Sequence, residues 1–193
     1  MLALGTVAPD FTLPHVATGR PYSLADFRGS KALLVVFLCA HCPYVVHVRP
    51  ELARIAADYA DRGVGIVGIT SNDVAQYPGD APAPTAHMAE EAGLNFPVLY
   101  DESQVVAHAY SAACTPDFFL FDADRKLVYR GQIDDSRPAR GVDRPSLGTL
   151  NGKDIRAALD AVITGRPVSA DQRPSIGCNI KWKPGNEPAW FAS

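Results

Sequence analysis

The sequence lacks any cluster of basic side chains and any hydrophobic run long enough to span a membrane. Its 18 Lys and Arg residues are outnumbered by 21 Asp and Glu residues, which gives a formal net charge of −3. We therefore expect neither nucleic acid nor an anionic membrane surface as the main partner. Residues 1–6 also lack the basic flank and apolar stretch of a signal peptide. Together these absences favour a cytoplasmic location.

Cysteine is scarce too, with four residues among 193: Cys39, Cys42, Cys114 and Cys178. In a reducing compartment such cysteines are more often catalytic or metal-binding than structural. The length suits one α/β domain with extensions and is sufficient to bury a substantial core. We expect a single domain over residues 1–165 and a C-terminal tail, residues 166–193, packed on it.

Two of the cysteines stand where a buried strand meets a helix. Residues 32–38 are seven consecutive apolar residues, a pattern typical of a strand that is buried on both faces. After Pro43, apolar residues recur at steps of three and four, which predicts an amphipathic helix with proline at its first position. Cys42 then lies at the helix start, where unpaired N–H groups and the helix dipole stabilise a thiolate. Cys39, three residues earlier, is within reach of a disulfide with Cys42.

The rest of the chain predicts a mixed sheet. Residues 64–70 form a second apolar run, and the strand–helix–strand unit implies parallel pairing. Residues 118–121 and 127–133 predict an antiparallel hairpin at the sheet edge. Short strand-like pieces at 11–13 and 22–24 predict an N-terminal β-hairpin. The remaining predicted elements are a strand-like piece at 95–100 and helices at 85–91, 102–110 and 151–163.

Residues 72–84 are rich in proline, glycine and aspartate, which predicts a loop. Because this loop follows the second parallel strand, it should lie at the same sheet edge as Cys42. There it either forms a wall of the site or is an ordinary surface excursion. Thr85 is available as the N-cap of the helix that follows.

In this order the motifs resemble the thioredoxin-fold superfamily, and within it the redoxin branch of alkyl hydroperoxide reductase and thiol-specific antioxidant proteins. Thr115 and Pro116 look like the cis-proline loop that faces the active cysteine of that superfamily. Further matches are the opening segments 5–13 and 23–29, Phe37 five residues before Cys42, and Pro50 eight residues after it. The resemblance implies an α/β thioredoxin-like fold, in which helices flank a central mixed sheet. It also implies an N-terminal β-hairpin, a redoxin insertion over residues 85–110 and a C-terminal tail.

The chain departs from both parent patterns. Thioredoxins carry their second cysteine three residues after the first, where this chain has Val45, and they carry a proton-accepting carboxylate where it has Val36. Peroxiredoxins have a proline and a threonine before the reactive cysteine, and these positions are Val35 and Cys39 here. Their peroxide-polarising arginine falls on Pro116. Neither parent mechanism therefore transfers whole.

From the residues and the resemblance we predict a thiol–disulfide oxidoreductase in which Cys42 attacks as the thiolate and Cys39 resolves the intermediate. The substrate would be a protein or small-molecule disulfide, or a peroxide. An external dithiol reductant of the thioredoxin or glutathione type would reset the pair, and no bound cofactor is needed. A homodimer is compatible with the resemblance, although no sequence feature selects its interface. The residues expected to support the site are Pro43, His41, Thr115, Pro116 and Cys114.

Several of these residues have two readings. Cys114, next to the proposed cis-proline loop, either helps to resolve a disulfide or only packs. His41 either stabilises the Cys42 thiolate as an imidazolium or faces solvent. Asp117, Asp134 and Asp135 could act as bases, and their spacing selects none of them.

The tail has a cysteine of its own. Cys178 is either an additional redox thiol, as tail cysteines are in some peroxiredoxins, or a buried anchor. The aromatic residues Trp182, Trp190 and Phe191 are further expected anchors.

Three alternatives to the disulfide reductase remain open. The first is a peroxiredoxin-like peroxidase. The second is a copper- or zinc-handling protein that uses Cys39, His41, Cys42 and Cys114 as ligands. The third is a non-catalytic scaffold with degenerate cysteines.

Overall fold

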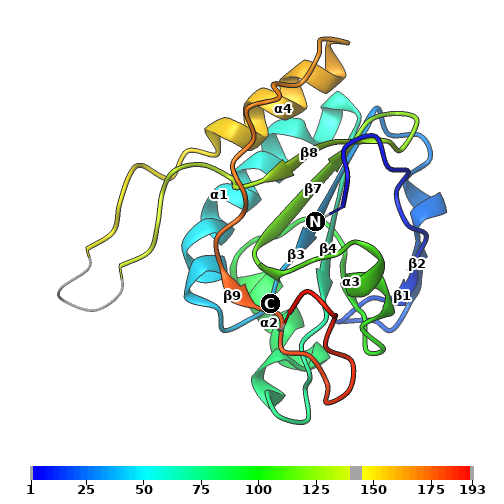
Figure 1. Cartoon of the computed structure of the whole chain (residues 1–193), viewed down its shortest axis with the longest axis vertical. Coiled ribbons are helices and arrows are strands. Elements are labelled where there is room, and N and C mark those ends of the chain that lie inside the picture. The colour runs from blue at the N-terminus through cyan, green and yellow to red at the C-terminus, as the bar shows by residue number, and fades with distance from the viewer. Residues whose placement is uncertain (1, 140–144, 192–193) are drawn as a thin grey trace.

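The computed structural model describes residues 2–139 and 145–191, and in them a five-stranded sheet has the order β5-β4-β3-β7-β8 (Figure 1). The strands β3 and β4 and the strands β4 and β5 pair in parallel, whereas β7 pairs antiparallel with both β3 and β8. The sheet is therefore mixed, as predicted. Its strands are β3 (Ala32–Phe37), β4 (Val64–Thr70), β5 (Val98–Tyr100), β7 (Asp117–Phe121) and β8 (Leu127–Gly131).

The central strand β3 is buried on both faces. Successive side chains of a strand point to opposite sides of the sheet, so the apolar run must serve two cores. Leu34 and Val36 belong to one core, and Leu33, Val35 and Phe37 belong to the other. This arrangement places the end of β3, and the cysteines that follow it, between two packed layers.

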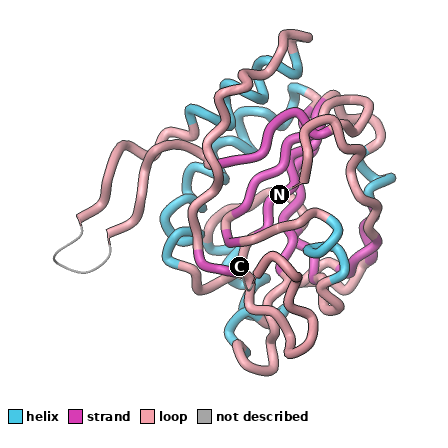
Figure 2. Tube along the Cα trace, viewed as in Figure 1, coloured by secondary structure: helices cyan, strands magenta, loops and turns pink. Residues whose placement is uncertain are grey.

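Helices cover the two faces unequally (Figure 2). The helices α1, α2 and α4 contribute to the first core, and α3 and the N-terminal hairpin contribute to the second. Among the described residues, no helix is both long and apolar enough to cross a membrane. The helices are α1 (Pro43–Tyr59), α2 (Pro82–Glu91), α3 (Val105–Ala109) and α4 (Lys153–Ile163), the hairpin strands are β1 (Thr12–Pro14) and β2 (Pro21–Ser23), and the 3-10 turns are η1 (Leu24–Phe27), η2 (Ala60–Arg62) and η3 (Pro78–Asp80).

A separate two-stranded sheet joins the tail to the body of the protein. The strand β6 (Cys114–Thr115) pairs antiparallel with β9 (Cys178–Asn179). Figure 1 shows the tail running from the end of α4 along the molecule to β9. The chain segment before the cis-proline loop thus lies beside a segment more than 60 residues further along.

Two predicted helix boundaries were wrong. The helix α2 begins at Pro82 rather than after Thr85, whose buried hydroxyl donates a 3.1 Å hydrogen bond to the Asp80 carbonyl instead of capping the helix. The helix α3 has five residues rather than the predicted span 102–110. Gln104 prevents an earlier start because its backbone has a φ of 64° and its side-chain amide donates to the Ser71 carbonyl.

The predicted tail anchors were right in part. Trp182 is buried, and its ring packs edge-on against the Trp190 ring at a centroid distance of 6.3 Å. Trp190 and Phe191 are 39% and 40% exposed, so they are less buried than the prediction implied, although Trp190 keeps its ring contact with Trp182. The apolar contacts that hold the tail come earlier, at Ile180 and Trp182, which belong to the second core.

Candidate active site

Cys42 stands at the junction between β3 and α1. It is the N-cap residue of α1, with an extended backbone, and Pro43 occupies the first helical position as predicted. Proline suits this position because its fixed φ fits the helix and its missing N–H would have no partner there. The Cys42 sulfur therefore faces the unpaired N–H groups of the first helical turn.

The sulfurs of Cys39 and Cys42 both contact Thr115, the residue before the cis-proline. The peptide bond between Thr115 and Pro116 is cis, as the resemblance implied. The Cys42 thiol donates a 3.0 Å hydrogen bond to the Thr115 carbonyl oxygen. The Cys39 sulfur lies 3.3 Å from the Thr115 hydroxyl oxygen. The structure thus brings Cys39, Cys42 and the cis-proline loop together.

The electrostatics of the site make the two thiols unequal. A hydrogen bond from the Cys39 thiol is the largest effect on the pKa of Cys42 and lowers it, against the opposing effect of burial. The same hydrogen bond is the largest cause of the raised pKa of Cys39, because the proton that Cys39 donates is held between the two sulfurs. Burial is the second largest cause and also raises this pKa. Cys42 therefore ionises first and is the better placed nucleophile.

The loop after β4 is a wall of the site. The Asp80 carboxylate accepts a 2.9 Å hydrogen bond from the Ala40 backbone N–H, within the turn that joins the two cysteines. Its other oxygen accepts a 2.9 Å hydrogen bond from the Asn72 side-chain amide. Asp80 is buried, so its negative charge lies inside the site, where it helps to raise the pKa of Cys39. The sequence analysis missed this residue, and its place in a loop that follows a parallel strand was the available signal.

His41 lies toward this wall. Its Nδ1 is 3.1 Å from Asp80 Oδ1, and its side chain is 65% exposed. The largest effects on the pKa of Cys42 come from Cys39, burial, Cys178 and the Val45 backbone. Of the two readings of His41, the geometry favours the solvent-facing one.

Cys114 lies on the other side of the cis-proline loop. It is buried, and its sulfur is 3.6 Å from the Pro116 carbonyl oxygen. Burial raises the pKa of Cys114 first, and the Asp117 charge raises it further. Asp117 itself has a pKa raised to about 6 by burial, even though its carboxylate accepts a 3.0 Å hydrogen bond from the Ala113 N–H. Cys114 therefore stays protonated at neutral pH and is a poor nucleophile.

Cys178 reaches the site from the tail. In the β6–β9 pair it stands opposite Thr115, the residue that contacts Cys39 and Cys42. Hydrogen bonds from the Cys178 side chain and backbone to the Cys42 sulfur contribute to the lowered pKa of Cys42. The sulfur of Cys178 therefore lies beside the sulfur of Cys42, in addition to that of Cys39.

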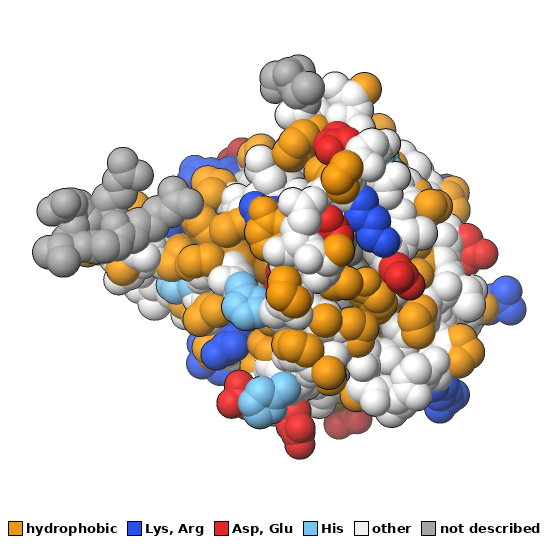
Figure 3. Space-filling view, turned by 90° about the horizontal axis from the view of Figure 1, so that it is seen from below, with side chains coloured by type: hydrophobic (Ala, Val, Ile, Leu, Met, Phe, Trp, Pro, Cys, Tyr) orange, Lys and Arg blue, Asp and Glu red, His pale blue; other side chains and the backbone are white. Residues whose placement is uncertain are grey.

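The face around the site is rich in apolar side chains. Figure 3 looks onto the lower edge of Figure 1, where β9 lies, and shows hydrophobic side chains gathered across the centre of this face. Exposed apolar residues close in sequence to the site are Val46, Tyr77 and Ile176.

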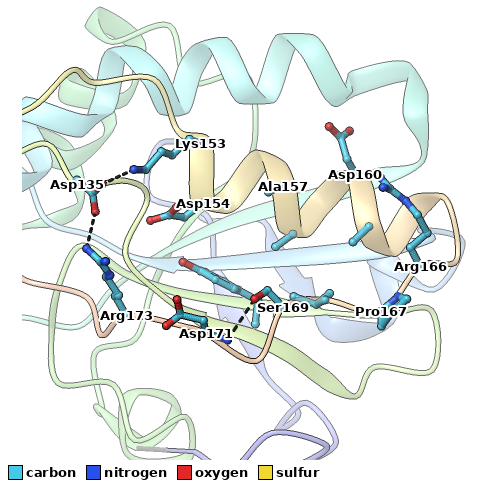
Figure 4. Close-up of a pocket in the computed structure, with 14 residues that line it drawn as sticks. Asp135, Lys153, Asp154, Ala157, Asp160, Arg166, Pro167, Ser169, Asp171 and Arg173 are labelled. Carbon is cyan, nitrogen blue, oxygen red and sulfur yellow. Dashed lines mark hydrogen bonds and ion pairs between the residues drawn. The ribbon is translucent and has the colours of Figure 1, made fainter.

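A separate cleft of about 500 Å³ lies between α4 and residues 166–173. Figure 4 shows its charged rim, where Asp135 pairs with Lys153 and with Arg173. None of the four cysteines lines it, so the thiol chemistry has no direct access to this cleft. In residues 2–139 and 145–191, no group of three or more His, Cys, Asp or Glu side chains is arranged to hold a metal ion.

Curated relatives of this chain include proteins with redox names. The chain is 27% identical over 161 residues to thiol-disulfide oxidoreductase ResA of Geobacillus thermodenitrificans, covering 83% of this chain and 79% of that protein. It is 32% identical over 111 residues to a putative peroxiredoxin of Mycobacterium tuberculosis, covering 58% of this chain and 65% of that protein.

Among solved structures, an uncharacterized conserved protein from Geobacillus kaustophilus is 54% identical, with a TM-score of 0.88 over 96% of this chain and 95% of that one. The thioredoxin domain of a thiol-disulfide oxidoreductase from Bacteroides vulgatus has a TM-score of 0.59 at 24% identity, over 81% of this chain and 98% of that one. The second likeness shows the fold, which is thioredoxin-like as predicted. A family model described as Redoxin matches residues 3–150, and the chain therefore belongs to the Redoxin family.

Proposed function

We propose that this redoxin is a thiol–disulfide oxidoreductase in which Cys42 is the nucleophile and Cys39 the resolving thiol. Membership of the Redoxin family, with relatives named as a thiol-disulfide oxidoreductase and a putative peroxiredoxin, makes the protein an oxidoreductase. The assignment of roles to Cys42 and Cys39 is supported by one observation. Cys42 lies at the start of α1, and the sulfurs of both cysteines contact Thr115. A thiolate at a helix start, with a second thiol three residues away, is suited to disulfide exchange.

The reaction begins on Cys42. Its thiolate attacks one sulfur of a substrate disulfide, the S–S bond of the substrate breaks, and the leaving thiolate takes up a proton. The product is a mixed disulfide on Cys42, which carries no negative charge.

Neutralising Cys42 activates Cys39. The hydrogen bond to the Cys42 sulfur is the largest cause of the raised pKa of Cys39, and it is lost once that sulfur is in a mixed disulfide. The Thr115 hydroxyl remains beside Cys39 and favours its thiolate. Cys39 then attacks the Cys42 sulfur, the substrate thiolate leaves, and a Cys39–Cys42 disulfide remains. An external reductant of the thioredoxin or glutathione type, such as the cytoplasm supplies, returns both cysteines to thiols.

Trapping the intermediate tests this proposal. The reduced Cys39→Ser/Cys178→Ser variant should retain a stable mixed disulfide on Cys42 after treatment with bis(2-hydroxyethyl) disulfide, whereas Cys42→Ser should form none at residue 39. Intact-mass measurement and peptide mapping after acid quenching identify the modified residue. Cys114→Ser is the matched control and should cycle like the parent protein. A mixed disulfide that forms on Cys39 first would contradict the assigned roles.

The peroxidase is the second candidate because Cys42 is only 4% exposed, which favours a small oxidant over a bulky one. In that reaction the Cys42 thiolate reacts with hydrogen peroxide and takes up a proton to give a sulfenic acid and water, and Cys39 then condenses with the sulfenic acid to give the Cys39–Cys42 disulfide and a second water. Stopped-flow mixing of the reduced protein with hydrogen peroxide separates the two candidates. A second-order rate constant no greater than that of an ordinary free thiol excludes the peroxidase.

A further inference from the structure

Both cysteines of the proposed pair are nearly inaccessible, with Cys39 3% and Cys42 4% exposed. Part of the cover is the tail segment of residues 175–181, called the strap from here on. The strap lies across β6 and is tied at both ends. The Ser175 hydroxyl donates a 2.6 Å hydrogen bond to the Gly131 carbonyl, and the Lys181 N–H donates a 2.9 Å hydrogen bond to the Asn72 side chain.

The backbone of the strap packs directly against the backbone of the cis-proline loop at Gly177, with no room for a side chain between them. A Cβ atom on Gly177 would lie 2.1 Å from the Thr115 carbonyl oxygen, so a residue with a side chain does not fit there without a shift of the strap. The Ile180 N–H donates a 3.2 Å hydrogen bond to the Ala113 carbonyl and holds the same register. The strap therefore occupies the edge of β6 that an extended peptide substrate would otherwise pair with.

This packing brings the Cys178 sulfur to Cys42. Cys178 stands opposite Thr115 in the antiparallel pair, where Cα atoms are about 4.5–5.5 Å apart. The Cys42 thiol donates to the Thr115 carbonyl at 3.0 Å, and Cys178 in turn hydrogen-bonds the Cys42 sulfur. Asn179, the next residue, is exposed, as alternation along a strand requires.

We propose that Cys178 is a second resolving thiol for Cys42, carried by a strap that sits in the place of a peptide substrate. This inference rests on the proposed function. The Cys178 thiolate attacks the Cys42 sulfur of a mixed disulfide, the bond to the substrate sulfur breaks, and the substrate thiolate takes the proton that Cys178 gave up. The product is a Cys42–Cys178 disulfide, so two protein thiols are oxidised for one substrate disulfide reduced.

The two resolving thiols differ in accessibility. Cys39 is buried, whereas Cys178 is half-buried on a segment that has exposed residues on both sides, Ile176 and Asn179. A disulfide on the strap is therefore more accessible to an external reductant than the buried Cys39–Cys42 pair.

The test uses the Cys39→Ser/Cys114→Ser variant, which retains Cys42 and Cys178. Treated with one equivalent of bis(2-hydroxyethyl) disulfide, it should release both 2-mercaptoethanol equivalents and yield a Cys42–Cys178 disulfide by peptide mapping. Adding Cys178→Ser should leave the mixed disulfide on Cys42 with a lifetime longer by on the order of tenfold or more, because an intramolecular thiol acts at high effective concentration.

A positional control moves the thiol by one residue. In the Cys39→Ser/Cys114→Ser/Cys178→Ser background, Asn179→Cys places a sulfur on the same strap but on the opposite face of the strand, and the mixed disulfide should persist. Resolution as fast as with Cys178 would overturn the proposal, as would a persistent adduct when Cys178 is present. Failure of Cys42 to form any adduct in the background without Cys178 would instead overturn the proposed function, and this inference with it. If serine at residue 39 prevents folding, Cys39→Ala provides the same comparison.

Discussion

The Cys42 thiol donates a 3.0 Å hydrogen bond to the carbonyl oxygen of Thr115, which lies 73 residues further along the chain. The same residue contacts the Cys39 sulfur through its hydroxyl and pairs with Cys178 through its strand. Thr115 is thus the point where three of the four cysteines converge.

The first concerns the acidity of Cys42. The Cys39 thiol is the largest cause of the lowered pKa of Cys42, so Cys39→Ala should raise that pKa. The rate of Cys42 alkylation by iodoacetamide, followed by mass spectrometry against pH, should shift to higher pH in this variant. Cys114→Ser should keep the parent profile, because burial raises the pKa of Cys114 and this thiol is uncharged over the pH range in which Cys42 ionises. Identical profiles for Cys39→Ala and the parent would contradict the hydrogen bond between the two sulfurs.

The second concerns the strap. Gly177→Ala places a Cβ 2.1 Å from the Thr115 carbonyl oxygen, so the strap must move away from β6. Cys42, 4% exposed in the parent, should then react faster with a bulky maleimide, as measured by the rate of mass increase at that residue. The matched control is Gly29→Ala, since a Cβ there meets no atom within 4 Å and its φ needs no glycine. Equal rates in the two variants would show that the strap does not limit access.

The third concerns the buried carboxylate of Asp80. Asp80→Ala leaves the Ala40 N–H and the Asn72 amide without their partner inside the protein, so the free energy of unfolding should fall by about 1–3 kcal/mol. Denaturant unfolding measures this loss. His41→Ala serves as the control and should change the free energy of unfolding by less than about 0.5 kcal/mol. The His41 ring is mostly exposed, so the substitution removes little beyond the contact between His41 and Asp80. A loss at His41 as large as at Asp80 would contradict this ranking.

The fourth concerns pH and Asp117. Its pKa is raised to about 6 in the folded protein, above the value of about 4 in an unfolded chain. A raised folded pKa contributes stability at pH values below the unfolded pKa, and this contribution is lost as the pH rises through the folded pKa. Between about pH 4 and about pH 7, the parent protein should therefore lose about 2 kcal/mol relative to Asp117→Asn.

Unfolding of both proteins at a series of pH values checks the Asp117 prediction. Comparing the variant with the parent cancels the opposite trends of Asp134 and Asp135, whose pKa values are lowered. A stability difference that stays constant with pH would contradict the raised pKa of Asp117.

The arrangement at Cys42 could be predicted from the sequence because its causes are local. The apolar run of β3 predicts burial on both faces, and Pro43 marks the first helical position wherever the helix packs. Helix boundaries were less predictable where distant groups intervene. The buried Gln104 amide bonds to Ser71 and Lys181, and these contacts override the helical pattern before α3.

The tertiary structure alone decided which other groups share the site. Asp80 approaches Ala40 because parallel strands end at one edge, and that rule selects an edge but no single side chain. Cys178 meets Cys42 because the tail returns to pair with β6, and no periodicity links two residues so far apart. The sequence by itself therefore determined the reactive sulfur and its helix, since hydrophobic burial and helix termination act over a few residues. The long-range packing of the tail determined the residues that surround that sulfur.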